Sequence, residues 1–242
     1  MFLEEFVGQL RWDASWSPKV ATSLGVSQYF LQNPTNLDNS SVPNQHGGNT
    51  RNAFGALTND YFPLAVDASL TYTLESFPFY NGSFPIRFGG EYLYNLAAKS
   101  GAPTDYYAWN LSATFGKAGK RGTWEFYYSY RWLGADSWYE ELTDDEFGGV
   151  YWQTPTEWAS SGAYPGVSAT PIAPAPPHAP NPNPSYYIPG TNVKGHILRF
   201  AYSPTDSLTL SVRCLLTDLI RPYPARSESQ ATRLEIDAML RF

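Results

Sequence analysis

Cysteine and histidine are scarce in this sequence of 242 residues: Cys214 is the only cysteine, and the three histidines stand far apart. A single cysteine excludes an internal disulfide and any multi-cysteine metal site, and the separated histidines argue against a zinc site. We also find no grouping of a nucleophile with a base and no phosphate-binding loop, so the sequence predicts neither an enzyme nor a bound cofactor or metal. The net charge of −6 argues against a nucleic-acid partner.

Long hydrophobic runs are missing as well. No apolar stretch approaches the roughly 18 residues of a membrane-spanning helix. The chain begins MFLEEFVGQL, which carries two glutamates and no basic segment, unlike a signal peptide. An exported protein would therefore have lost its signal peptide, or the chain is a fragment.

Aromatic residues, in contrast, are abundant, and apolar residues are regularly diluted by polar ones. Aromatics make up 17% of the chain, and hydrophobic residues make up 43% although the mean hydropathy is only −0.36. Such dilution is expected when apolar and polar side chains alternate along β-strands. Residues 232–242, TRLEIDAMLRF, show this most clearly, because every second residue is apolar and the residues between them are mostly charged.

The same alternation recurs along the chain and predicts nine strands, joined alternately by short turns and long connections. Outer-membrane barrels have short turns at the periplasmic rim and long loops outside. Soluble sandwiches have no reason to sort their loops by length. The strands are expected at residues 2–16, 20–31, 61–74, 84–96, 106–116, 123–133, 193–203, 208–217 and 232–242.

We therefore expect an all-β fold, an antiparallel up-and-down transmembrane β-barrel that forms a single domain over residues 1–242. Single-chain bacterial barrels have an even number of strands, so about nine strands indicate the C-terminal part of a larger barrel, incomplete at its N-terminus. The longest connection, 134–190, is expected to be an external loop. It is rich in proline from residue 154, a composition that disfavours strand pairing.

The two faces of the strands are expected to have different surroundings. The apolar parity would meet lipid, and its aromatic residues fall near both rims, as in the girdles of membrane barrels. The other parity carries arginines and carboxylates, which predicts a polar lumen with a transverse field; alternatively, these charges are stabilising pairs beside a plugged interior. The predicted pore-lining residues are Arg11, Asp13, Asp67, Arg87, Glu91, Glu125, Arg131, Arg199, Arg213, Arg233, Glu235 and Asp237.

An acidic segment, ADSWYEELTDDEFGG at residues 135–149, opens the longest connection. Clustered carboxylates could bind calcium, or the segment could fold inward and narrow the pore. Charge runs are usually solvated, so a solvated acidic loop is the favoured interpretation.

Two runs, DSWYEELTDDEFGG (136–149) and GTNVKGHILRFAYSPTDSLTLSVR (190–213), carry a resemblance, together with a final strand that ends in phenylalanine. They resemble the C-terminal part of a family of Gram-negative outer-membrane β-barrels that are named as porins by inference. In this chain the proline-rich segment 150–188 separates the two runs. The resemblance implies an outer-membrane barrel, passive diffusion, and a role for Phe242 as a signal read by the barrel-assembly machinery.

The sequence thus predicts a porin of the bacterial outer membrane, a water-filled channel for passive diffusion of ions and small hydrophilic solutes. Its partners would be the lipid bilayer, the assembly machinery and these solutes, and self-association into a homo-oligomer is left open. Two alternatives stand beside it: a barrel that acts as an adhesin or receptor, and a soluble β-sandwich that binds carbohydrate through its tyrosines and tryptophans.

Overall fold

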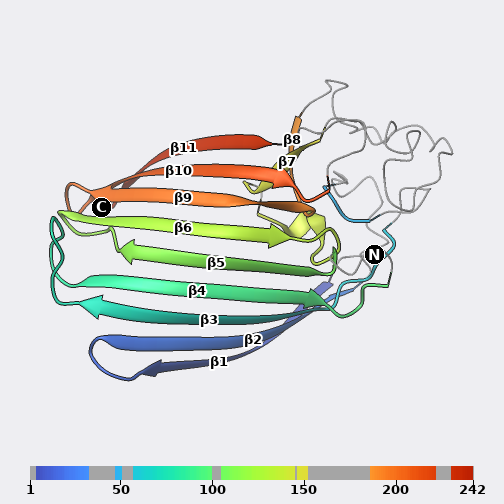
Figure 1. The fold of residues 1–242 in the computed structure, drawn as a ribbon, viewed down its shortest axis with the longest axis horizontal. Coiled ribbons are helices and arrows are strands. Elements are labelled where there is room, and N and C mark those ends of the chain that lie inside the picture. Colours follow the sequence, from blue (N-terminus) through green and yellow to red (C-terminus); the bar gives the residue numbers. More distant parts are fainter. Residues whose placement is uncertain are drawn as a thin grey trace.

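The protein forms one large antiparallel sheet in a computed structural model that describes residues 4–32, 47–50, 57–99, 105–144, 146–151, 186–221 and 230–241. Nine strands pair in the order β1-β2-β3-β4-β5-β6-β9-β10-β11, which follows the chain except that β7 and β8 are left out between β6 and β9 (Figure 1). The predicted all-β, up-and-down antiparallel arrangement is confirmed. The sheet is open, with β1 and β11 at its two edges. The strands are β1 (Glu4–Ser15), β2 (Val20–Gln32), β3 (Pro63–Leu74), β4 (Phe84–Asn95), β5 (Tyr107–Gly116), β6 (Thr123–Leu133), β9 (Val193–Ser203), β10 (Leu208–Leu219) and β11 (Ala231–Leu240).

All nine predicted strands are present, and their bounds agree with the prediction within two residues. The extension of β10 matters most, because it adds Asp218 to the strand. Asp218 pairs with Lys194 of β9 in the register, so opposite charges face each other at the rim of the mostly apolar face. Cross-strand pairs of opposite charge are favourable, which explains how this rim position tolerates them.

The long connection between β6 and β9 contains two further short strands, β7 (Gly148–Tyr151) and β8 (Tyr186–Pro189), which pair with each other. The expectation that strand pairing is absent from the proline-rich segment is therefore wrong for β8. Tyr186, Tyr187 and Ile188 are aromatic or β-branched and favour strands. Pro189 stands at the end of β8, where the missing N–H disturbs the pairing least.

The connections are sorted by length between the two ends of the sheet (Figure 1). The short turns 16–19, 75–83, 117–122 and 204–207 lie at one end, and the strand ends that the long connections 33–62, 96–106, 134–192 and 220–230 join lie at the other. In the turn after β5, Gly116 and Gly122 adopt φ values of 75° and 76°, which residues with a side chain rarely adopt. The Gly122 N–H donates to Ser203 O at 2.8 Å and ties this turn to β9.

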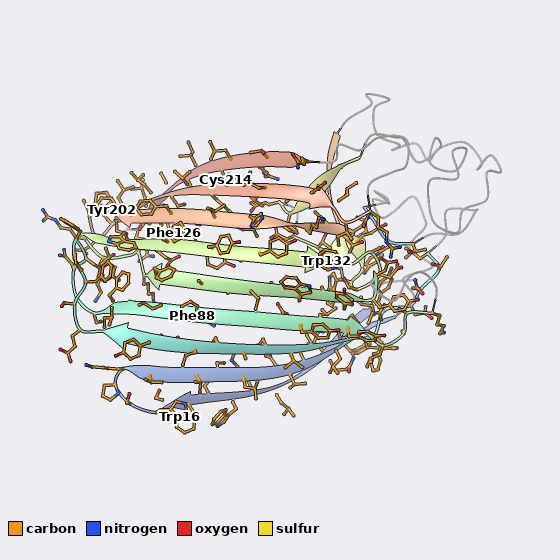
Figure 2. All side chains as sticks on the ribbon, viewed as in Figure 1. Trp16, Phe88, Phe126, Trp132, Tyr202 and Cys214 are labelled. Atoms are coloured by element: carbon orange, nitrogen blue, oxygen red, sulfur yellow. The ribbon has the colours of Figure 1, made fainter. Side chains whose placement is uncertain are left out.

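One face of the sheet is apolar from edge to edge, because the register pairs residues of the same parity. One such row joins Tyr72, Ile86, Phe115, Phe126, Phe200, Val212 and Ile236 across seven strands. Figure 2 labels six side chains of this face, from Trp16 beyond β1 to Cys214 in β10. Many of its large side chains are exposed, with Leu10 at 81%, Ile236 at 76% and Phe88 at 52%.

The buried hydrophobic clusters lie on the opposite, polar side of the sheet or at its long-connection end. Phe147 packs with Val193, Ile197 and Leu215. A second cluster joins Leu31, Leu57, Tyr61 and Tyr139. Most of the buried apolar side chains therefore lie between the polar face and the connections that return over it. Phe84 is an exception: it is fully buried on the other parity and packs with Phe77, Tyr80 and Trp124 at the short-turn end.

Candidate functional site

The polar face of the sheet brings distant charged residues together because the register aligns their parity. In the row that crosses its middle, Asp67 of β3 pairs with Glu91 of β4, Glu91 with Asn110 of β5, and Asn110 with Arg131 of β6. The pairing places all twelve residues predicted to line a pore on this one face. That they line a pore stays a prediction.

Arg11 is the centre of a charged group on β1, β2 and β3. Its Nε lies 3.3 Å from Asp13 Oδ1, its Nη1 lies 3.6 Å from Asp67 Oδ2, and its Nη2 donates to Ser23 Oγ at 2.6 Å. Gly25 stands between Arg11 and Asp67 in the same row. A Cβ on Gly25 would overlap Asp67 Oδ1, so the glycine leaves room for the Arg11–Asp67 pair.

A second charged group spans β6, β9, β10 and β11. Arg199 and Arg213 are direct cross-strand neighbours, an arrangement that is destabilising for like charges. Arg199 contacts Glu125, and Arg213 Nη1 lies 3.5 Å from Glu235 Oε2. Glu235 also forms an ion pair with Arg233, with 2.7 Å between Arg233 Nε and Glu235 Oε1. Each arginine therefore has a carboxylate beside it that offsets the repulsion.

Three of the twelve residues have no ion pair among the residues that the structure describes. Arg87 Nη2 donates to Ser69 Oγ at 3.2 Å. Glu91 Oε2 accepts from the side-chain amide of Asn110 at 2.9 Å. Asp237 faces Ser211 in the register. These three carry charge on the polar face that other described charges do not neutralise by direct contact.

The acidic segment folds inward onto this face. Asp144 Oδ2 lies 3.0 Å from Arg131 Nη1 and 3.6 Å from Arg213 Nη2, and Glu146 contacts Arg213 as well. The favoured interpretation of a solvated acidic loop is thus wrong for this part of the segment. The charge run is drawn inward because two arginines of the sheet, on β6 and β10, supply the opposite charge.

Phe147 anchors the segment beside these ion pairs. Its side chain is 2% exposed and packs against Val193, Ile197 and Leu215 of the sheet. The Arg131 guanidinium lies 5.5 Å from the centroid of the Phe147 ring, within the range of a cation–π contact. Apolar residues on the polar parity of β9 and β10 therefore provide the docking surface for the segment.

A buried network of hydrogen bonds holds the start of the segment against the connection from β2 to β3. The side-chain amide of Asn49 donates to Ala135 O at 2.6 Å and to Trp138 O at 2.8 Å. In return, Glu140 N–H donates to Asn49 Oδ1 at 2.9 Å, and Asn49 N–H donates to Glu140 Oε2 at 2.6 Å. Asn49 thus bonds to the segment through both its backbone and its side chain, which fixes the segment relative to another connection.

Asp136 is a second buried member of this junction, outside the strands. Its carboxylate accepts from Thr50 N–H at 2.9 Å and from Thr50 Oγ1 at 2.5 Å. Its backbone is held by Asp105 O and by the side chain of Asn95, at 2.8 Å each. Burial raises the pKa of Asp136 from 3.8 to about 6, although the hydrogen bonds from Thr50 act in the opposite direction.

A cavity of about 270 Å³ lies between the inward-folded segment and strands β4, β5 and β6. Glu91, Asn110 and Arg131 of the central polar row line it on the side of the sheet. Trp138 and Phe147 line it on the side of the segment. The ring of Trp138 stands edge-on to Tyr29 of β2, with centroids 4.9 Å apart, and its Nε1–H donates to Leu142 O at 3.1 Å.

The sequence identified the charges of the sheet but missed the residues that enclose them. Asn49, Trp138 and Phe147 come from connections whose position depends on contacts with remote strands. Phe242, the predicted assembly signal, lies outside the described residues. Within the described residues there is no group of three or more histidines, cysteines, aspartates or glutamates placed to hold a metal ion, and no helix is long and apolar enough to cross a membrane.

Comparison with known proteins adds no relative: no protein family, no curated protein and no solved structure matches this chain. The resemblance of the acidic segment and of residues 190–213 to outer-membrane porins stays a prediction from the sequence.

Proposed function

We propose that this sheet is part of a transmembrane β-barrel of a bacterial outer membrane, and that the barrel is a porin through which ions and small hydrophilic solutes diffuse passively. The observation that carries the proposal is the pairing of an exposed apolar face with a charged face onto which the acidic segment folds. In such a barrel the apolar face meets lipid and the charged face meets the water of the lumen.

The size of the apolar face supports this placement. At about 4.8 Å per strand and 3.3 Å per residue, nine strands of ten residues cover roughly 40 Å by 33 Å, well over 1,000 Å². Soluble monomers rarely expose an apolar patch of more than a few hundred Å². Strands of 10–13 residues are also long enough for a tilted strand to cross a bilayer, which takes about 9–11 residues.

The relative direction of the two edge strands determines how many further strands would close the proposed barrel. β1 and β11 are separated by seven strands in an antiparallel sheet, so they run in the same direction. If every pair in the closed barrel is antiparallel, an odd number of further strands must join the two edges, which gives an even total as in single-chain bacterial barrels.

A soluble carbohydrate-binding sandwich would need a second sheet over the apolar face. The second described sheet consists of β7 and β8. β7 comes directly after Glu146 and Phe147, which contact Arg213 and Val193 on the polar side instead. Extraction separates the two proposals, because a sandwich stays in aqueous buffer whereas a barrel needs detergent. A barrel that serves as an adhesin or receptor has the same two faces, so conduction must separate it from a porin.

The porin proposal is tested by recording currents after the complete protein is reconstituted in a planar bilayer. We expect stepwise, ohmic conductance increases, because a water-filled lumen conducts without a voltage-driven change. Correctly folded, membrane-inserted protein that gives no conductance would reject the porin and leave the adhesin or receptor.

A further inference from the structure

The cavity beneath the acidic segment is lined by a carboxylate, Glu91, that has no ion pair among the described residues. Arg131 is neutralised there by Asp144, 3.0 Å away. Glu91 accepts a hydrogen bond from the neutral amide of Asn110 at 2.9 Å, and no basic side chain pairs with it among the described residues. Its cross-strand neighbour on the other side is Asp67, another carboxylate, which is paired with Arg11. Glu91 is therefore a negative charge at the cavity for which the described residues supply no counter-charge.

Much of the cavity lining is apolar. Trp138, Leu142 and Phe147 line it from the segment, beside Thr143 and the Arg131-bound Asp144. Leu93 and Leu133 line it from the sheet. The indole N–H of Trp138 already donates a hydrogen bond to Leu142 O, so the rest of the ring offers only apolar and π contacts. A bare metal ion would gain little from such walls, since hard cations take several oxygen ligands.

We propose that this cavity is a binding subsite for small organic cations, protonated primary amines with a short hydrocarbon body. The ammonium group pairs with the Glu91 carboxylate, and the hydrocarbon body lies against Trp138 and Leu142. The volume of about 270 Å³ suits a solute smaller than a typical drug-sized ligand. As a solute site of a channel the inference rests on the proposed porin, because the cavity lies on the face assigned to the lumen.

An anion is disfavoured at this position by the same contacts. Arg131, the one arginine among the described residues that line the cavity, already binds Asp144 and lies 5.5 Å from the centroid of the Phe147 ring. An incoming carboxylate would have to displace Asp144 and would meet Glu91 nearby. The cavity is thus expected to discriminate by the sign of the charge, which a purely hydrophobic pocket would not do.

Three probes with four carbon atoms each test the inference: n-butylammonium, butanoate and 1-butanol. Binding to the complete protein in detergent micelles is followed by calorimetry and by tryptophan fluorescence. We expect saturable binding of n-butylammonium that weakens at least tenfold in Glu91→Gln, whereas butanoate and butanol bind at least tenfold more weakly than the amine. Asp237→Asn is the matched control, because it neutralises another carboxylate of the same face that has no ion pair among the described residues. Asp237 lies on β11 and does not line the cavity, so this substitution should leave binding unchanged.

The side-chain carbonyl of the glutamine introduced by Glu91→Gln can still accept from Asn110, so the fold is expected to survive, and circular dichroism checks this. Equal binding of the three probes, preference for butanoate, absence of saturable binding, or full amine affinity in Glu91→Gln would each overturn the inference. Binding in micelles does not require conduction. A conducting pore without amine binding therefore rejects only the subsite, and amine binding by a protein that never conducts rejects only the porin.

Discussion

At the scale of single residues, adjacent positions on one strand are expected to differ sharply. Leu210 of β10 lies on the apolar face and is 45% exposed. Ser211, the next residue, lies on the polar face between Ala201 and Asp237 in the register. The two residues are adjacent in sequence, so a comparison of substitutions at Leu210 and Ser211 isolates the effect of the face on which the side chain lies.

Leu210→Arg should destabilise the membrane-inserted protein, because arginine at the lipid face costs about 2–4 kcal/mol at the midplane of a bilayer and less toward its interfaces; Leu210 is the third residue of β10. Ser211→Arg should cost much less, because the new charge points to water and has Asp237 opposite. Urea unfolding in lipid vesicles measures both variants. Equal losses would show that the two faces have the same surroundings.

The raised pKa of Asp136 predicts that the stability of the junction between the two connections depends on pH. Its pKa rises from 3.8 to about 6 on folding, so the folded protein holds this proton more tightly than the unfolded chain. The stabilising contribution is complete below about pH 3.8 and is lost as the pH rises through about 6. At about 1.36 kcal/mol per pKa unit, the difference is of the order of 3 kcal/mol.

Asp136→Asn should remove this step, and the measurement is the difference in unfolding free energy between the two proteins from pH 4 to pH 8. The stability of the unmodified protein should fall relative to that of the variant as the pH increases. A constant difference over that range would mean that Asp136 does not titrate in this way.

At the scale of elements, the strands were predictable and the returning segment was not. Alternation is a local property, so residues such as Leu234 and Ile236 are sufficient to locate a strand and its apolar face. The position of Phe147 depends on Val193, Ile197 and Leu215, which follow it by a long stretch of chain. Charge composition favoured solvent for the acidic segment, and only the assembled sheet places Arg131 and Arg213 where they can bind Asp144.

The close approach of β9 and β10 gives a prediction about a single glycine. A Cβ on Gly195 would overlap Leu216 O and lie 2.8 Å from Thr217 Cα, whereas a Cβ on Gly8 of β1 would meet nothing within 4 Å. Gly195→Ala should therefore cost about 1–3 kcal/mol, as overpacking usually does, and Gly8→Ala should be close to neutral. Thermal unfolding of both variants checks this, and similar melting temperatures for the two would contradict the packing described for β9 and β10.

At the scale of the whole molecule, the ion selectivity of the proposed porin would depend on which arginines are already paired. Arg131 is bound to Asp144, whereas Arg87 has no ion pair among the described residues. A fixed charge in a lumen raises the local concentration of ions of opposite sign. Salt weakens the effect, because the Debye length falls from about 10 Å at 0.1 M to about 3 Å at 1 M.

Arg87→Glu should shift the reversal potential in a salt gradient toward cation selectivity, and more at low salt than at high salt. Arg131→Glu should do the same and should also loosen the acidic segment, since two carboxylates would then face each other. We expect increased current noise or a larger conductance for that variant alone. Reversal potentials that neither substitution changes would exclude these residues from the conduction path.

The assignment of one face to lipid and the other to water is tested most directly by labelling single cysteines along β10 in lipid vesicles. In a Cys214→Ser background, cysteines replace Thr209, Leu210, Ser211 and Val212 in turn. Positions 209 and 211 should react with a charged maleimide, whereas a fluorophore at 210 and 212 should be quenched by nitroxide-labelled lipid. Equal reaction with the charged reagent at all four positions, or the reverse pattern, would contradict the placement of this sheet in a membrane.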